Sequence, residues 1–423
     1  MRSSGTCPHA GFRLTNSPVI RFQRWLLMLS VAGCLGPLNS IGQIDSTKRE
    51  LIQLGYNAAL EGHPPLSAYA FFYLNEPEFV NTNMALRLAI APTYLDSELG
   101  FRHLLGPNTD LGIDLAGGGF ADSYDEIHQG TFLPAESFDG HGGEFGLSVY
   151  HLFNPGQTIP LYGVLRGLGH YATYSRNSDT ADNFELPPDH ETYSVRAGVR
   201  WGGRAPTLFP AFSMELSAWY EGRFRSTSGT YGYDDRTLEP QSHLFWAQAG
   251  LGYTLPKLKH SFHADLTAGT SLDADRFSAY RLGGLLPLVS EFPLSLPGYY
   301  YQEISAKDFV LLSGNYIIPF DQKQHWNLDL SAAAAWVNYL PGLTQPGNWQ
   351  SGVGAGLLYK ARSWRVAIGY GYGINAIRSH GRGADSVGVL MQFDLEEAKG
   401  NLFRPSEPGL WRGIERIFGL FGD

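Results

Sequence analysis

Apolar and polar residues alternate along most of this chain, in short segments separated by turn residues. In 326–337 one set of alternate positions carries tryptophan, leucine and alanine, whereas the other set includes Asn327 and Asp329. Segments 193–201 and 364–372 alternate in the same way, with tyrosine or tryptophan within the apolar stripe. Because successive side chains of a strand point to opposite faces, this period of two predicts β-strands with one apolar and one polar face.

The alternation delineates sixteen predicted strands. They are 51–58, 65–75, 83–93, 97–105, 109–121, 142–154, 159–173, 190–202, 211–225, 242–254, 259–271, 306–319, 324–339, 349–361, 363–375 and 384–395. A closed barrel with both chain ends on one side requires an even number. The first strand carries the weakest pattern, since 45–60 could instead begin as a helix capped by Ser46.

The gaps between the predicted strands differ in length on the two sides of the sheet. Most gaps after odd-numbered strands are long: 122–141, 174–189, 226–241, 272–305, 340–348 and 376–383. Gaps after even-numbered strands are mostly short, and the clear exception on the long side is 94–96. Outer-membrane barrels combine short periplasmic turns with long outer loops, so we expect both ends of the barrel to be periplasmic.

Composition favours lipid over a second protein layer on the apolar face. Charged residues make up only 17% of the chain, aromatic residues 13%, and glycine occurs 51 times. A soluble β-sandwich would also alternate, but its outward face would be polar and lack aromatic borders. The formal net charge of −9 argues against a nucleic-acid partner, whose phosphates would be repelled. We therefore predict an all-β, transmembrane antiparallel barrel.

The first 42 residues have the layout of a secretory signal peptide. Arg21 and Arg24 precede the short apolar run 25–33, and cleavage is expected before Gln43. An alternative is a lipoprotein signal that would lipidate Cys34. The two cysteines, Cys7 and Cys34, both lie in this segment, so no disulfide or thiolate metal site is expected in the mature chain.

The barrel is expected to occupy 43–395 and to be followed by a periplasmic tail at 396–423. Within the tail, 408–421 places its apolar residues on one helical face, which predicts a short amphipathic helix. A disordered tail with a few apolar residues is the alternative. No shift in composition indicates a second folded domain.

The stretch 277–320 resembles the bacterial surface-antigen superfamily of sixteen-stranded barrels, which contains the BamA/TamA-like outer-membrane assembly factors and the two-partner secretion transporters. The residues that carry the resemblance are Arg281, Gly283, Gly284, Pro297, Gly298 and Tyr299. In that superfamily a Gly-Gly segment and an Arg-Gly-Tyr or Arg-Gly-Phe tip lie in the sixth outer loop, after eleven strands and before five. The predicted strands place this stretch at the same position.

Two departures from the family pattern affect what the resemblance implies. The family's loop-tip arginine folds into the lumen and pairs with acids of the wall, but Pro297 stands at that position here. Asp329 could have been the partner of that arginine, and Arg281 could substitute for the missing arginine. The family also carries periplasmic polypeptide-transport-associated domains, whereas only 43–50 separate the expected cleavage site from the first strand, so those domains are not expected.

No short catalytic motif such as Gly-x-Ser-x-Gly is found, and no catalytic residue, metal or cofactor is expected. Single strand histidines are interpreted as interface or lumen residues, and loop acids as solvated or as weak calcium ligands. Charged residues of mixed sign are expected to face the lumen and to pair there: Arg166, Arg196, Arg200, Glu215, Asp265, Asp329 and Arg365.

The leading functional hypothesis is a non-enzymatic role in membrane biogenesis or transport at the outer membrane of a Gram-negative-type bacterium. Its expected partners are outer-membrane lipid, lipopolysaccharide and client outer-membrane proteins. A passive pore for small solutes is the second hypothesis, and an enzyme housed in the barrel is the third.

Overall fold

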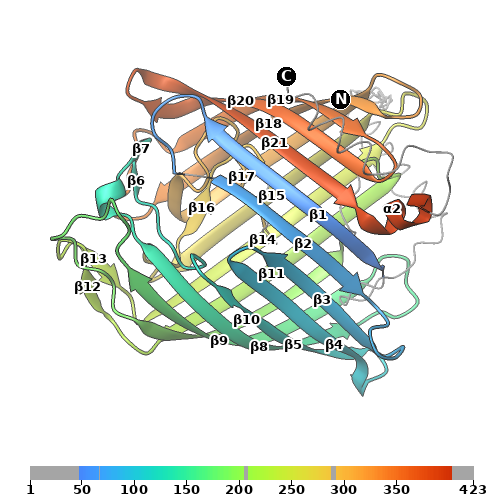
Figure 1. Cartoon of the computed structure of the whole chain (residues 1–423), viewed down its shortest axis with the longest axis horizontal. Coiled ribbons are helices and arrows are strands. Elements are labelled where there is room, and N and C mark those ends of the chain that lie inside the picture. The colour runs from blue at the N-terminus through green and yellow to red at the C-terminus, as the bar shows by residue number, and fades with distance from the viewer. Residues whose placement is uncertain (1–46, 66, 204–207, 287–291, 403–423) are drawn as a thin grey trace, which may run out of the picture.

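Sixteen long strands form one closed antiparallel barrel in the computed structural model, which describes residues 47–402 except 66, 204–207 and 287–291 (Figure 1). The barrel strands are β1 Arg49–Ala59, β2 Ser67–Glu76, β3 Met84–Ala91, β4 Tyr94–Gly106, β5 Thr109–Gly118, β8 Asp139–Leu152, β9 Leu161–Ser175, β10 His190–Gly202, β11 Phe212–Arg225, β14 Gln241–Thr254, β15 Ser261–Leu272, β17 Ile304–Pro319, β18 Trp326–Tyr339, β19 Trp349–Lys360, β20 Trp364–Arg378 and β21 Gly381–Asp394. The predicted fold class is confirmed, including eleven strands before the long sixth loop and five after it.

Each barrel strand pairs with the next barrel strand along the chain, and the ring closes where the first meets the last. β1 pairs with β21 over nine residue pairs, from Leu51↔Asp394 to Ala59↔Ser386. The segment that could have begun as a helix is therefore a strand, because its backbone completes the hydrogen-bonded ring on both sides.

The barrel has a loop end and a turn end. The loop end carries 60–66, 92–93, 119–138, 176–189, 226–240, 273–303, 340–348 and 379–380, and the turn end carries the seven other connections. The short strands β6 Ile127–His128, β7 Thr131–Phe132, β12 Gly229–Tyr231, β13 Arg236–Leu238 and β16 Tyr280–Leu282 belong to loops. The long gap expected at 376–383 is absent, because β20 and β21 continue their pairing past a bulge to Arg378↔Gly381.

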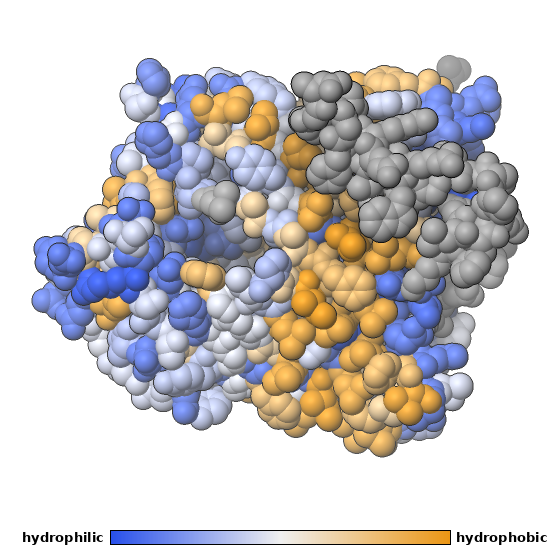
Figure 2. All heavy atoms as spheres, viewed as in Figure 1, coloured by the Kyte–Doolittle hydropathy of each residue, from blue (hydrophilic) through white to orange (hydrophobic). Residues whose placement is uncertain are grey.

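In strands such as β18 the alternation separates a buried inner face from an exposed outer face. In β18 the outward Trp326, Leu330 and Trp336 are 38–47% exposed, whereas the inward Asn327 and Ala335 are fully buried. Figure 2 shows apolar side chains gathered over β1 to β5, whereas the end that carries β6, β7, β12 and β13 is mainly hydrophilic. This outer apolar surface is the lipid-facing surface of a transmembrane barrel.

The inner wall carries charged side chains among polar and apolar ones, and these charged groups are hydrogen-bonded. Arg196 of β10 donates to Glu221 of β11 at 2.6 Å, and Arg200 donates to Glu215 at 3.0 Å. Arg166 of β9 donates to the hydroxyl groups of Ser148 and Tyr150, each at 2.9 Å. Asp329 accepts from the Asn315 amide at 3.1 Å, and Arg365 donates to Gln392 at 3.1 Å. Arg196 and Arg200 thus meet acids, whereas Arg166, Asp329 and Arg365 bond to uncharged groups.

One described helix follows the barrel at the turn end, α2 Leu395–Leu402. Asp394 accepts from the Glu397 N–H at 3.0 Å and so caps it. The alternation did not reveal this helix, because it begins directly where the last strand ends. The signal peptide at 1–42 and the amphipathic helix at 408–421 lie outside the described residues and stay predictions.

No helix among the described residues is long and apolar enough to cross a membrane.

Replacing a lipid-facing residue near the middle of β10 tests the outer surface. Val195 is 44% exposed on the outer face. We expect Val195→Arg to lower the unfolding free energy in lipid vesicles by about 2–4 kcal/mol, because hydrocarbon solvates a guanidinium poorly. Denaturant titration of vesicle-embedded protein measures the change. Val195→Leu is the matched control and should change stability little; equal behaviour of both variants would show that water, not hydrocarbon, covers this face.

Candidate functional site

The sixth loop, residues 273–303, is called loop six here, and its described parts, 273–286 and 292–303, fold back into the barrel. Its first part forms β16, which pairs with β17 through Tyr280↔Ala306 and Leu282↔Ile304. Gly283 donates to the Leu294 carbonyl at 3.0 Å, and Gly284 accepts from the Leu296 N–H at 2.9 Å. Backbone hydrogen bonds therefore hold loop six both before and after residues 287–291.

The tip of loop six lies on a glycine-lined stretch of the inner wall. Gly298 has φ of +85°, and a Cβ there would lie 1.8 Å from the Gly373 nitrogen of β20. On β19, a Cβ at Gly352 would lie 2.1 Å from the Pro297 carbonyl oxygen. Any side chain at these positions would push the tip off the wall, so the glycines allow the close backbone contact.

A buried ion pair joins loop six to the wall. Both guanidinium Nη atoms of Arg378, at the end of β20, donate to the Glu303 carboxylate at 3.0 Å. The two side chains are 1% and 0% exposed. Arg378 also donates to the Gly298 carbonyl at 3.3 Å and lies 3.8 Å from the centre of the Tyr300 ring. We call Glu303, Arg378 and the Pro297–Gly298 tip the loop-six latch.

Two tyrosines of loop six extend the latch to neighbouring elements. The Tyr299 hydroxyl donates to Gln350 of β19 at 2.7 Å, and Gln350 donates to the Tyr339 hydroxyl of β18 at 2.6 Å. The Tyr300 hydroxyl donates to the Glu61 carbonyl in the first loop at 3.1 Å. Tyr299 is fully buried. Loop six is thus attached to both sides of the β1–β21 junction.

The side chain of Arg281, the other arginine considered for the pairing, bonds to loop carbonyl groups and not to Asp329. Arg281 donates to the carbonyl groups of Gln302, at 3.0 Å, and Asp125, at 3.0 Å, and so ties loop six to the 119–138 loop. Asp329 pairs in register with Gly356, four residues or about 13 Å along β19 from the Gly352 contact, so the tip does not reach it. The suggested Arg281–Asp329 pairing is therefore wrong.

The structure supplies the charge pair with its partners exchanged. The resemblance implied an arginine on the loop and an acid on the wall, whereas here the wall provides Arg378 and the loop provides Glu303. The sequence shows both residues, but neither lies in the motif that carries the resemblance, and they are 75 residues apart.

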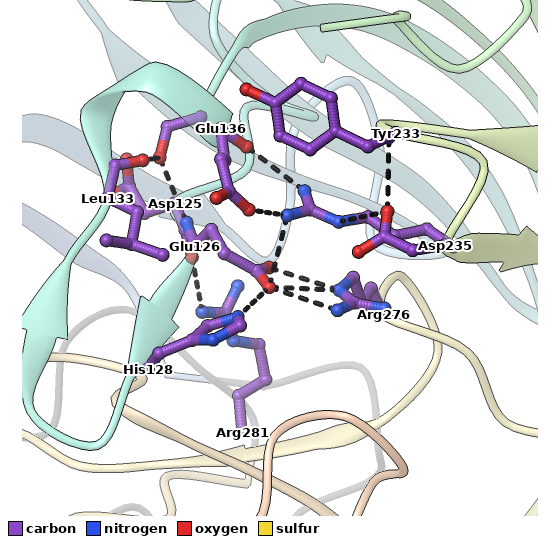
Figure 3. A network of polar contacts seen from close by, with 11 residues as sticks. Asp125, Glu126, His128, Leu133, Glu136, Tyr233, Asp235, Arg276 and Arg281 are labelled. Carbon is purple, nitrogen blue, oxygen red and sulfur yellow. Dashed lines mark hydrogen bonds and ion pairs between the residues drawn. The ribbon is translucent and has the colours of Figure 1, made fainter.

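A second buried cluster closes the loops over the barrel. Glu126 of the 119–138 loop is fully buried, accepts from Arg276 at 3.1–3.2 Å and forms an ion pair with Arg236 at 3.5 Å. Arg236 also binds Glu136, and His128 lies 2.5 Å from Glu126. Figure 3 shows the Glu126 carboxylate facing both Arg276 and His128. We call the loop segments 119–138, 226–240 and 273–276 the loop cap.

The charges of the loop cap hold Glu126 ionised. Burial alone would raise the pKa of this carboxyl group, but hydrogen bonds from His128 and Arg276 and the positive charges of Arg276 and Arg236 outweigh burial and lower the pKa to about 2. Glu126, His128 and Glu136 also place their ligand atoms within 4.8 Å of one another, a spacing that could hold a metal ion. Because two arginines already neutralise the two carboxylates, the cluster is better described as an ionic network.

The fold has counterparts among solved structures. CdiB from Acinetobacter baumannii matches with a TM-score of 0.56 and 11% identity over 82% of this chain and 60% of that chain. CdiB from Escherichia coli gives 0.55 and 11%, over 82% and 63%. BamA from Haemophilus ducreyi lacking POTRA domains 1–3 gives 0.51 and 12%, over 82% and 70%. This chain has the barrel fold of BamA and CdiB.

No family model matches the sequence, and no curated protein matches it either. The chain covers 60% and 63% of the two CdiB chains, less than two thirds of each. At 11–12% identity the BamA and CdiB likeness concerns the fold, and it confirms the predicted sixteen-stranded barrel type.

The histidines that could have served a catalytic site have other contacts. His141 approaches the Ser175 hydroxyl at 3.4 Å, but its other ring nitrogen faces the Phe120 N–H at 3.2 Å rather than an acid. His170 lies 3.0 Å from Asp122. His263 lies 3.0 Å from the Ser261 hydroxyl and 3.1 Å from the Leu208 carbonyl. None of these contacts forms a hydrogen-bonded chain of a serine hydroxyl, a histidine ring and a carboxylate.

Neutralising the latch acid tests whether the ion pair holds loop six. Glu303→Gln keeps the side-chain shape but leaves Arg378 buried without a counter-charge. We expect the unfolding free energy to fall by about 3–5 kcal/mol and loop six to become more sensitive to protease. Denaturant unfolding and limited proteolysis measure both effects. Glu185→Gln, an exposed acid in the 176–189 loop, should change stability by less than about 0.5 kcal/mol; similar losses for both variants would refute the latch.

The loop cap should lose stability in acid through Glu126. Its folded pKa of about 2 lies below the unfolded value of about 4.3, so its stabilisation is present above the unfolded pKa and is lost as the pH falls toward 2. The expected loss is on the order of 3 kcal/mol. Hydrogen exchange of 124–138, corrected for intrinsic rates, measures it. Glu126→Gln should remove most of this pH dependence; an unchanged profile would rule out Glu126 as its source.

Proposed function

We propose that this protein acts without catalysing a reaction in the outer membrane of a Gram-negative-type bacterium, where it inserts or moves polypeptide or lipid. The observation that carries the proposal is the loop-six latch inside a barrel of the BamA and CdiB fold. The family that the sequence resembles contains outer-membrane assembly and secretion barrels. A latched internal loop beside the β1–β21 junction fits a wall or lumen that rearranges around a client protein.

The uneven height of the barrel supports a role at the bilayer. β17 has sixteen residues, whereas β3, two strands from the junction, has eight. At about 3.4 Å per residue and a tilt of about 40°, eight residues rise only about 20 Å, less than the roughly 25 Å of a usual apolar band. Lipid beside β3 would be compressed, which lowers the cost of inserting another strand there.

The internal contacts of loop six disfavour a permanently open pore. Leu285 lies against β19 to β21, where a Cβ at Gly354, Gly371 or Gly388 would come within 3.0–3.3 Å of it. Phe292 lies against Trp219 and Trp246 of β11 and β14. The two wall regions are separated by β15, β17 and β18, so the described parts of loop six reach across part of the lumen.

Reconstitution tests the proposal. Liposomes containing the purified protein should speed the folding of a denatured small client barrel relative to empty liposomes and to liposomes with a general diffusion porin, because a rearranging wall or compressed lipid lowers the insertion barrier. The resistance of the folded client to protease measures the rate. Lipid and peptide movement are followed in the same vesicles. Absence of all three activities would end the proposal, and a large steady conductance in planar bilayers would favour a passive pore.

A further inference from the structure

Two inward-facing tryptophans form a flat aromatic surface in the middle of the lumen wall. Trp219 of β11 and Trp246 of β14 are direct cross-strand partners, and they are 5% and 8% exposed. Their rings are 6.1 Å apart and within 10° of parallel. Gly198 of β10 stands opposite Trp219, and a Cβ there would lie 2.2 Å from the indole ring. The glycine thus makes room for the ring to lie along the wall.

Two arginines border this aromatic surface. The Arg200 guanidinium lies 5.4 Å from the centre of the Trp219 ring, and that of Arg196 lies 5.6 Å from Trp246. Their ion pairs with Glu215 and Glu221 fix them in place. Cations at such distances are attracted to the electron-rich ring faces. We call Trp219, Trp246, Arg196 and Arg200 the tryptophan clamp.

The clamp already holds one aromatic side chain from the same chain. The Phe292 ring of loop six lies 5.3 Å from Trp219 at 64° and 5.4 Å from Trp246 at 72°. Edge-to-face contacts at this distance are a preferred aromatic geometry. Arg200 lies 6.0 Å from the same ring. A segment of ordinary polypeptide can therefore place an aromatic side chain here.

The clamp also has hydrogen-bonding capacity that Phe292 does not use. The indole N–H groups of Trp219 and Trp246 are buried, and neither has an acceptor among the described residues. A buried donor without an acceptor is costly, and tryptophan N–H groups usually find one. A hydrocarbon ring offers none, whereas the backbone carbonyl groups of a peptide lying across the clamp would.

We propose that the tryptophan clamp binds an aromatic side chain of an extended client polypeptide, and that Phe292 occupies the clamp as an internal ligand in the absence of the client. The proposal rests on the proposed function, which it deepens by naming the partner's chemistry. Release of Phe292 opens the clamp in the middle of the barrel wall, and a client aromatic residue takes its place on the two indole rings.

A photo-crosslinking competition in detergent tests the clamp without requiring transport. The full-length protein is irradiated with a short neutral peptide that carries a central benzoylphenylalanine, and the crosslinked residues are mapped by mass spectrometry. Crosslinks are expected at Trp219, Trp246 or their inward neighbours. The same peptide with phenylalanine should compete at least about fivefold better than its alanine counterpart, since two ring contacts together correspond to roughly fivefold to a hundredfold in affinity.

Variants identify the occupied site. Phe292→Ala should increase crosslinking because it removes the internal ligand, and Trp219→Leu should decrease it. Phe245→Leu changes the lipid-facing residue next to Trp246 on β14 and should have no effect. A heat-modifiable gel shift checks that each variant is folded. Equal competition by the alanine peptide, crosslinks confined to the lipid face, or no increase with Phe292→Ala overturns the proposal.

The outcome is separable from that of the proposed function. Crosslinking at the clamp together with inactive liposomes would leave the clamp as a peptide site and refute the transport role. Active liposomes without specific crosslinking would refute the clamp and keep the transport role.

Discussion

Hydrocarbon offers no hydrogen bonds, so every backbone N–H and C=O group of a strand that crosses it must be paired within the protein. The β1–β21 pairing meets this constraint by turning a row of strands into a ring without edges. The rest of the structure follows from that closure. The outward side chains face lipid, the inward side chains share a lumen, and the long connections gather at one end, where they can fold over the opening or into it.

Loop six uses the space that closure creates. A lumen lined by large side chains would have no room for it, but β19 and β20 present glycines where the Pro297–Gly298 backbone approaches. The backbone contact therefore depends on complementary shape. The Glu303–Arg378 pair adds an electrostatic attraction, and either charge would be costly to bury without its partner. Exchanging the acid and the base between loop and wall keeps this electrostatic attraction unchanged, since attraction depends on the product of the two charges and not on which element carries each.

The loop cap and the latch are physically connected. The turn after β6 lies beside the end of β20, where a Cβ at Gly130 would come within 1.8 Å of the Ile377 carbonyl oxygen. Arg281 links loop six to the same cap segment through the Asp125 carbonyl. Movement of loop six would thus disturb the cap, and the ionised Glu126 at its centre opposes that movement because it pairs with Arg276 and Arg236. The lumen and the loop end are for this reason joined by direct contacts.

The sequence by itself determined the barrel, because alternation with a period of two is a local property that lipid on one side and a packed lumen on the other impose strand by strand. The strand count and the position of loop six could be predicted in this way. Only the tertiary structure decided which charges meet. Arg378 and Glu303, or Trp219, Trp246 and Phe292, become neighbours through barrel closure and the return of loop six, and no sequence spacing encodes a contact between elements that the fold brings together across the lumen.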